Sequence, residues 1–208
     1  MPNDRKATVK KRPQAEQSPT LGLRKLLITC LLAVLPLGAW AQLADENLVH
    51  GLPTGYKIDF QNRQGNMVIT EMVPQAESVK NWTEMMTTQT FLGLKTATPD
   101  SFRAYMQKTW ADTCKGAEFA TVARGEENGY PFAVWIQGCP LNAATGKPEH
   151  TFFKAIKGND SFYVLQRAFK YSPTKDQVTQ AMVLLRDAKV CDSRLPDRPC
   201  MKVDKPAQ

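Results

Sequence analysis

The chain has 208 residues, of which 42% are hydrophobic, and its 27 lysines and arginines exceed its 20 aspartates and glutamates by seven. Most of this excess lies at the start, because residues 1–25 hold seven of the basic residues and two of the acidic ones. The chain from Gln42 onward therefore has a net charge of only +2, which argues against nucleic acid as a partner.

The first predicted element is a cleavable export signal. Two basic residues precede an uncharged apolar run, 26–41, which ends in Ala-Trp-Ala, a small-x-small pattern that signal peptidase accepts. The run contains Pro36 and has 16 residues, whereas a spanning helix needs about 20 apolar residues. We predict a disordered basic segment over 1–25, cleavage after Ala41, and a periplasmic mature chain, 42–208, that forms one domain with a proline-rich C-terminal tail and no transmembrane segment.

The mature chain opens with a predicted hairpin and a third strand. Apolar and polar residues alternate over 55–60, the period of two that is typical of a half-buried strand. A turn at 64–66 leads to a second strand over 67–73, which Pro74 closes. A third strand is predicted over 82–92, which is rich in Thr, Met and Phe.

A helix is predicted next, with Thr98 as its cap and Pro99 at its first position. Apolar residues at helical spacing give this helix one buried face: Phe102, Tyr105, Met106 and Trp110. Turn residues then separate four predicted strands: 119–123, 131–138, 151–157 and 161–171.

A second amphipathic helix is predicted after Ser172-Pro173, as a cap and first turn, with an apolar stripe that runs from Val178 to Ala188. The short loops between successive strands favour antiparallel neighbours. We therefore predict an α+β fold, in which a twisted antiparallel sheet of about seven strands is packed by two amphipathic helices. We expect both helices on the apolar face of the sheet, with a two-sided sandwich as the alternative.

Four cysteines remain in the mature chain, and an oxidising compartment makes them disulfide partners. Three pairings are possible, and we favour Cys114 with Cys139 and Cys191 with Cys200, because the second bridge ties the C-terminal tail to its helix. The sequence has no Cys-x-x-Cys pair, which argues against a zinc site and against a thiol oxidoreductase. We expect no metal and no cofactor.

Carboxylates offer the strongest catalytic candidates. Glu71 and Glu84 lie in neighbouring predicted strands, and on a shared sheet face they could act as acid and base, with the pKa of one raised by the other. Neither a nucleophile elbow nor a metal cluster supports catalysis, so we favour a non-enzymatic role. A small periplasmic hydrolase that uses the two glutamates is the alternative.

Binding residues are predicted in the loops. Tyr130 follows Asn128-Gly129 and is predicted to lie near a loop tip as the best exposed aromatic residue, beside Glu126 and Glu127. His150 ends the loop 140–149 and could orient a ligand. We predict that these two regions form one loop-rich edge that binds an envelope protein or another envelope component. Storage of a small ligand between sheet and helices is a further hypothesis.

Three segments, 81–85, 127–135 and 158–164, resemble an uncharacterised family of exported proteobacterial proteins. Their sequences are Asn-Trp-Thr-Glu-Met, Glu-Asn-Gly-Tyr-Pro-Phe-Ala-Val-Trp and Gly-Asn-Asp-Ser-Phe-Tyr-Val. The resemblance covers most of the mature chain and implies a Gram-negative periplasm. It implies no activity, cofactor or catalytic residue.

Overall fold

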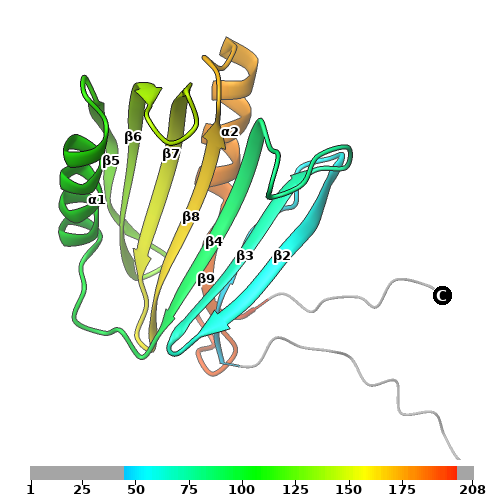
Figure 1. Ribbon diagram of the computed structural model, residues 1–208. Coiled ribbons are helices and arrows are strands. Elements are labelled where there is room, and N and C mark those ends of the chain that lie inside the picture. The colour runs from blue at the N-terminus through cyan, green and yellow to red at the C-terminus, as the bar shows by residue number, and fades with distance from the viewer. Residues whose placement is uncertain (1–44, 201–208) are drawn as a thin grey trace, which may run out of the picture. The chain divides into compact units, whose positions relative to one another are not determined.

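The computed structural model describes residues 45–200 (Figure 1), so the predicted export signal and its cleavage site lie outside the described residues. The elements within this range are β1 (Glu46–Val49), β2 (Tyr56–Gln64), β3 (Met67–Pro74), β4 (Glu84–Leu92), α1 (Pro99–Thr113), β5 (Glu118–Glu127), β6 (Tyr130–Asn142), β7 (Lys147–Lys157), β8 (Ser161–Phe169), α2 (Lys175–Asp187) and β9 (Lys189–Asp192). No helix in this part of the chain is long and apolar enough to cross a membrane.

Seven of the strands form one antiparallel sheet in the order β2-β3-β4-β8-β7-β6-β5. The predicted α+β fold is thereby confirmed. Two short strands were not predicted: β1 pairs with β9 in a separate antiparallel ribbon. Each has only four residues, too few to display a clear period of two.

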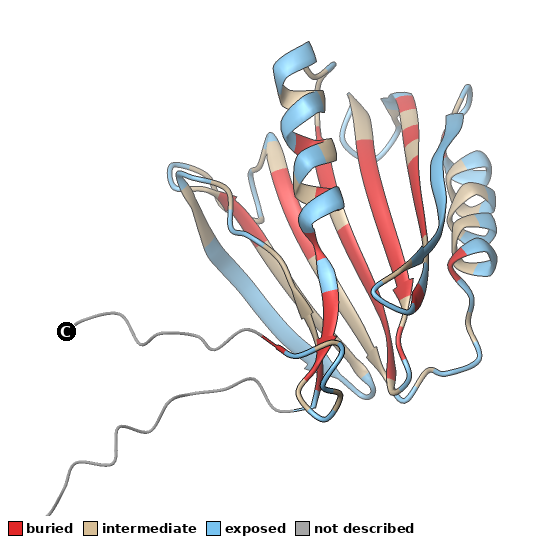
Figure 2. Cartoon of the chain, turned by 180° about the vertical axis from the view of Figure 1, so that it is seen from behind, coloured by how far each residue is buried: buried red, intermediate tan, exposed pale blue. Residues whose placement is uncertain are grey.

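The two helices cover opposite faces of the sheet. Phe152 packs in the cluster that contains Ala181 and Leu185 of α2, whereas the next residue, Phe153, packs in the cluster that receives Trp110 of α1. Successive strand residues point to opposite faces, so these clusters define an α2 face and an α1 face. Figure 2 shows α2 lying across the sheet on the side away from the viewer of Figure 1. The expectation that both helices share one face is wrong, and the two-sided sandwich is correct.

Both helices begin at capping boxes. Thr98 accepts a hydrogen bond from the backbone N–H of Ser101 at the start of α1, and Pro99 occupies the first turn as predicted. In α2 the cap is Thr174, paired with Gln177, two residues later than the predicted start at Ser172-Pro173. A Thr-x-x-Gln box satisfies two backbone donors reciprocally, which explains the later start.

Aromatic side chains dominate the α1 face of the core. Trp135 and Phe153 stack in parallel with ring centroids 4.9 Å apart, and Phe102 of α1 lies 5.4 Å from Phe162. The indole N–H of Trp135 donates to Gln137 (2.7 Å), so this buried polar group is satisfied. Burial of each such ring stabilises the fold by about 1.5–3 kcal/mol.

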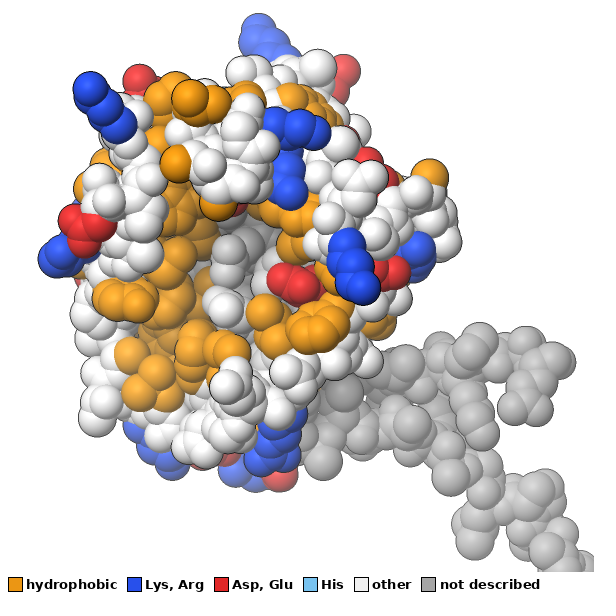
Figure 3. Space-filling model, in the orientation of Figure 1, with side chains coloured by type: hydrophobic (Ala, Val, Ile, Leu, Met, Phe, Trp, Pro, Cys, Tyr) orange, Lys and Arg blue, Asp and Glu red, His pale blue; other side chains and the backbone are white. Residues whose placement is uncertain are grey.

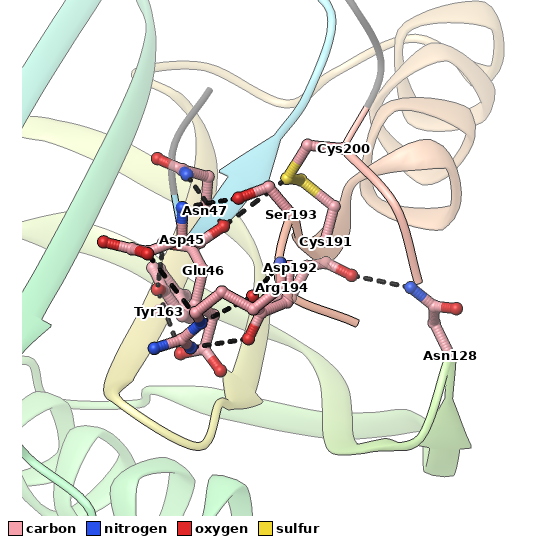
Figure 4. The surroundings of a disulfide bond; sticks show 11 residues. Asp45, Glu46, Asn47, Asn128, Tyr163, Cys191, Asp192, Ser193, Arg194 and Cys200 are labelled. Atoms are coloured by element: carbon pink, nitrogen blue, oxygen red, sulfur yellow. Dashed lines mark hydrogen bonds and ion pairs between the residues drawn. A yellow bond between two sulfur atoms is a disulfide. The ribbon is translucent and has the colours of Figure 1, made fainter. Parts of the chain in front are cut away.

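Both predicted disulfides are confirmed. Cys114–Cys139 joins the end of α1 to β6, and Cys191–Cys200 ties the C-terminal segment to β9, with Cα atoms 5.9 Å and 4.9 Å apart. Figure 4 shows the second bridge beside the start of β1, where Glu46 reaches Tyr163. The two ends of the described chain are therefore held to each other and to the sheet.

Candidate functional site

A cleft opens on the α2 face between α2, β2 and the segment that precedes β2. Its volume is about 660 Å³, within the range of small-molecule and peptide pockets. Residues 51–54 form one wall, and Gln177, Gln180, Val183 and Leu184 of α2 contribute to the other. We call this feature the α2 cleft.

A cluster of hydrogen bonds lies at the base of the α2 cleft, centred on Glu84 of β4. Its Oε2 accepts from the Tyr56 hydroxyl of β2 (2.5 Å) and from Nη2 of Arg167 of β8 (2.5 Å). Its Oε1 accepts from the hydroxyl of Tyr171 and from Nε2 of Gln177 (3.0 Å). Side chains from β2, β4, β8, α2 and the segment before α2 therefore converge on one carboxylate.

This cluster contains no free acid or base. A carboxylate offers about four lone-pair sites, and four donors occupy those of Glu84. Burial and the hydrogen bond to Glu84 raise the pKa of Tyr56, and the same causes raise the pKa of Tyr171 to about 12. Both phenols stay protonated at neutral pH and donate to Glu84, and the Tyr171 hydroxyl also accepts from Nε2 of Gln177 (2.6 Å).

Arg167 is the charged side chain with unused capacity at this site. It is only 7% exposed, and its guanidinium lies over the rings of Tyr56 and Phe169, 4.4 Å and 5.0 Å from their centroids. Its Nη1 is buried and has no hydrogen-bond partner within residues 45–200. An unsatisfied buried donor costs about 1–3 kcal/mol, and the ion pair of the same guanidinium with Glu84 and its contacts with the two rings offset that cost.

Exposed hydrophobic side chains border the α2 cleft. Leu52 and Val183 line it and are 49% and 39% exposed. Ile58, 53% exposed, lies two residues after Tyr56 on the same side of β2. Clustered exposed apolar side chains mark interaction surfaces more often than single ones do.

A second groove lies on the other side of α2, against β5, β6 and β7. It has a volume of about 480 Å³ and an apolar lining that includes Phe132, Val134 and Met182. Lys154, 2% exposed, contributes its charge and donates to Glu127 (2.5 Å) and to the carbonyl of Ala188 (2.7 Å). Burial lowers the pKa of Lys154, and the hydrogen bond to Glu127 opposes that shift.

The prediction that Tyr130 is exposed is wrong, because it is 1% exposed. Asn128 and Gly129 form the predicted turn with positive φ angles of 53° and 72°. However, Arg198 of the C-terminal segment packs over the Tyr130 ring, 5.0 Å from its centroid. The Cys191–Cys200 bridge holds that segment near the turn, and a contact so distant in sequence leaves no local pattern.

The predicted binding edge is not one surface. In β5–β6 pairing, Glu126 lies opposite Pro131, whereas in β6–β7 pairing His150 lies opposite Gly138. Pro131 and Gly138 are seven residues apart along β6, which is about 23 Å at 3.3 Å per residue. Successive turns of an antiparallel meander fall at alternate ends of the sheet, so the loop at 127–130 and the loop before His150 point in opposite directions. Glu126 is exposed, while Glu127 and His150 are half-buried.

The two glutamates of the hydrolase hypothesis lie on opposite faces. Glu71 pairs with Thr87 across β3 and β4, and Thr87 is three residues from Glu84 along β4. An odd separation along a strand reverses the face, so Glu71 points to the α1 face and Glu84 to the α2 face. The proposed acid–base pair is therefore wrong. Glu84 does belong to the α2 cleft, but its partners Arg167, Tyr171 and Gln177 carry no local motif that could have revealed them.

Within residues 45–200, no group of three or more His, Cys, Asp or Glu side chains is placed to hold a metal ion. Comparison with protein-family models and with curated proteins gives no match to this chain.

Proposed function

We propose that the protein is a non-catalytic binding module of the periplasm, which holds a segment of an envelope protein in the α2 cleft. The observation that carries this proposal is the saturated carboxylate of Glu84 at the base of the cleft, while the other carboxylate of the lining, Asp187, is ion-paired with Arg186 (2.8 Å). The two disulfides fit an oxidising compartment.

The lining of the α2 cleft favours a peptide with apolar side chains and no charge. Gln177, Gln180 and Thr54 present amide and hydroxyl groups, which can pair with a peptide backbone. An anionic ligand group would meet the Glu84 carboxylate 2.5 Å from Nη2 of the Arg167 guanidinium, so a neutral acceptor fits better. Leu52 and Val183 can cover apolar side chains of the segment.

A photo-crosslinking amino acid in the cleft wall tests the proposal in cells. The crosslinker replaces Thr54, an exposed residue of the cleft, and in a control it replaces Leu141, a 60% exposed residue at the β6–β7 turn. We expect a discrete adduct from position 54 alone. The adduct protein is then purified and its affinity measured.

The variant Leu52→Asp should weaken binding of that protein about 10- to 100-fold, because it removes about 1.5–3 kcal/mol of apolar burial. Leu141→Asp, matched in exposure and chemistry, should leave the affinity unchanged. Equal adducts from both crosslinker positions, or equal affinity of both aspartate variants, would eliminate the α2 cleft as the binding site.

Storage of a small apolar ligand is a second candidate, favoured by the apolar groove beside Lys154. Native mass spectrometry of protein released by osmotic shock checks it. A bound small molecule that is lost on Met182→Glu would support storage, and a bare protein mass would count against it.

A further inference from the structure

The α1 face of the sheet has an open part that α1 does not cover. Helix α1 packs against β6 and β7, whereas β3 and β4 continue the same face beyond it. The strand register identifies this part, because Gln89 and Phe91 of β4 lie opposite Val164 and Phe162, which belong to the α1-face core. Figure 3 shows this side of the molecule as a hollow, with hydrophobic side chains along its walls and an acidic side chain within it.

The floor of this hollow is polar but uncharged. Nε2 of Gln166 donates to Oε1 of Gln89 (3.0 Å), and Nε2 of Gln89 lies 4.0 Å from the sulfur of Met67. Thr87 continues this row of β4 and is 9% exposed. These neutral groups satisfy one another, and Lys57 of β2, which lies opposite Val73 on the same face, is ion-paired with Asp59 (3.4 Å). One other charged residue that the described strands β2, β3 and β4 place on this face has no partner.

That residue is Glu71 of β3. It is half-buried and has no hydrogen-bond or ion-pair partner within residues 45–200. Its cross-strand neighbours are Phe60 of β2, which is 38% exposed, and Thr87 of β4. Burial raises the pKa of Glu71, and no charged neighbour counters this. Partial burial of an unpaired carboxylate beside Phe60 destabilises the fold, so a ligand that brings a positive charge would offset this cost.

We propose that the hollow on the α1 face binds an amphiphile with a single cationic head group. The ammonium lies against the carboxylate of Glu71, and the alkyl body lies along the half-buried side chains of Ile69, Met67 and Phe91. The charge of Glu71 disfavours an anionic head group. This site is separate from the α2 cleft, because the two lie on opposite faces of the sheet.

Three amphiphiles with the same alkyl chain test the proposal by isothermal titration calorimetry below their micelle-forming concentrations: decyltrimethylammonium, decyl maltoside and decyl sulfate. We expect the protein to bind the cation most tightly and the sulfate most weakly. Glu71→Gln should weaken binding of the cation about tenfold, equivalent to about 1.4 kcal/mol, and leave the maltoside unchanged. Glu126→Gln, which removes an exposed carboxylate from β5, should change nothing.

Equal affinity for cation and sulfate, or a cation affinity that Glu71→Gln leaves unchanged, would overturn the proposal. Absence of binding by all three amphiphiles would do the same. Size-exclusion chromatography of the ligand-free protein measures its oligomeric state as a further test. A dimer that dissociates on Ile69→Lys would overturn the proposal, because a second copy would then occupy the hollow. Thermal unfolding of each variant verifies that it is folded.

Discussion

The buried pair of Lys154 and Glu127 allows a sharp test of the electrostatics of this fold. Lys154 is 2% exposed, whereas the Glu127 side chain is 28% exposed. Two variants break the pair from opposite sides: Glu127→Gln keeps the buried ammonium, and Lys154→Met removes it at similar volume. We expect them to differ strongly in the free energy of unfolding, although each removes one member of the same ion pair.

Glu127→Gln leaves a buried ammonium whose described partners are the Ala188 carbonyl, at 2.7 Å, and a neutral amide oxygen. Loss of one partner of a buried ion pair lowers the free energy of unfolding by about 3–5 kcal/mol. The retained carbonyl and the partial exposure of residue 127 reduce this to about 2–3 kcal/mol. Lys154→Met loses the charge-assisted bond to Ala188, about 1.5–3 kcal/mol, but avoids an ammonium desolvation penalty of several kcal/mol. Its net change should lie within about 1 kcal/mol of zero.

Urea unfolding followed by circular dichroism measures both changes at neutral pH. The double variant should have the same free energy of unfolding as Lys154→Met alone, because Glu127→Gln destabilises the fold only while the Lys154 ammonium is present. Burial lowers the pKa of Lys154 in the folded protein below its ordinary value of 10.5. Between these two pKa values, Lys154 binds its proton more tightly in the unfolded chain than in the folded protein. Wild-type stability should therefore rise with pH as it approaches 10.5, and Lys154→Met should lack this rise. A loss from Lys154→Met as large as that from Glu127→Gln would refute this reasoning.

Two further predictions concern stability. Serine substitution of Cys114 and Cys139 should cost about 3.5 kcal/mol, and of Cys191 and Cys200 about 2.5 kcal/mol, because the bridges close loops of 25 and 9 residues. Urea midpoints measure both, and a larger loss from the shorter loop would show that contacts of β9 outweigh chain entropy. Burial raises the pKa of Glu71 in the folded protein above its ordinary value of 4.5. The protonated side chain therefore stabilises the folded protein below pH 4.5, and this stabilisation is lost as the pH rises through the folded-state pKa. Glu71→Gln should raise Tm at neutral pH by about 1–2 °C and not below pH 4.5, and a Tm unchanged at neutral pH would contradict this.

Local patterns predicted most of the fold. The alternation over 55–60, the Thr98-Pro99 start of α1 and the Asn128-Gly129 turn each encode their structure within a few residues. The cysteine pairs were predictable because Cys114, Cys139 and Cys191 each lie at the end of a predicted element, and Cys200 lies nine residues after Cys191 in the tail that the bridge ties down. The strands β1 and β9 were missed because their pairing joins the two ends of the described chain, and neither strand is long enough to show a period.

The binding surfaces were less predictable, because they depend on register. A shift of one residue in the strand register moves each side chain to the other face of the sheet. In β4, the Met85-Met86 and Thr87-Thr88 pairs place like residues at successive positions, so the sequence does not show which member of each pair faces which side. The exposure of Tyr130 depended on Arg198, which lies far from it in sequence. No sequence period could show that a C-terminal arginine covers this ring.

The register of β4 also explains why two glutamates on adjacent strands have opposite chemistry. Glu84 faces α2 and the segment before it, where four donors occupy its two oxygens and leave it no capacity for another ligand group. Glu71 faces the side that α1 leaves open, where no described side chain pairs with it. A site built around Glu84 therefore selects a neutral ligand, and a site built around Glu71 selects a cation. Because the sheet separates the two, occupation of one site does not require that the other be empty.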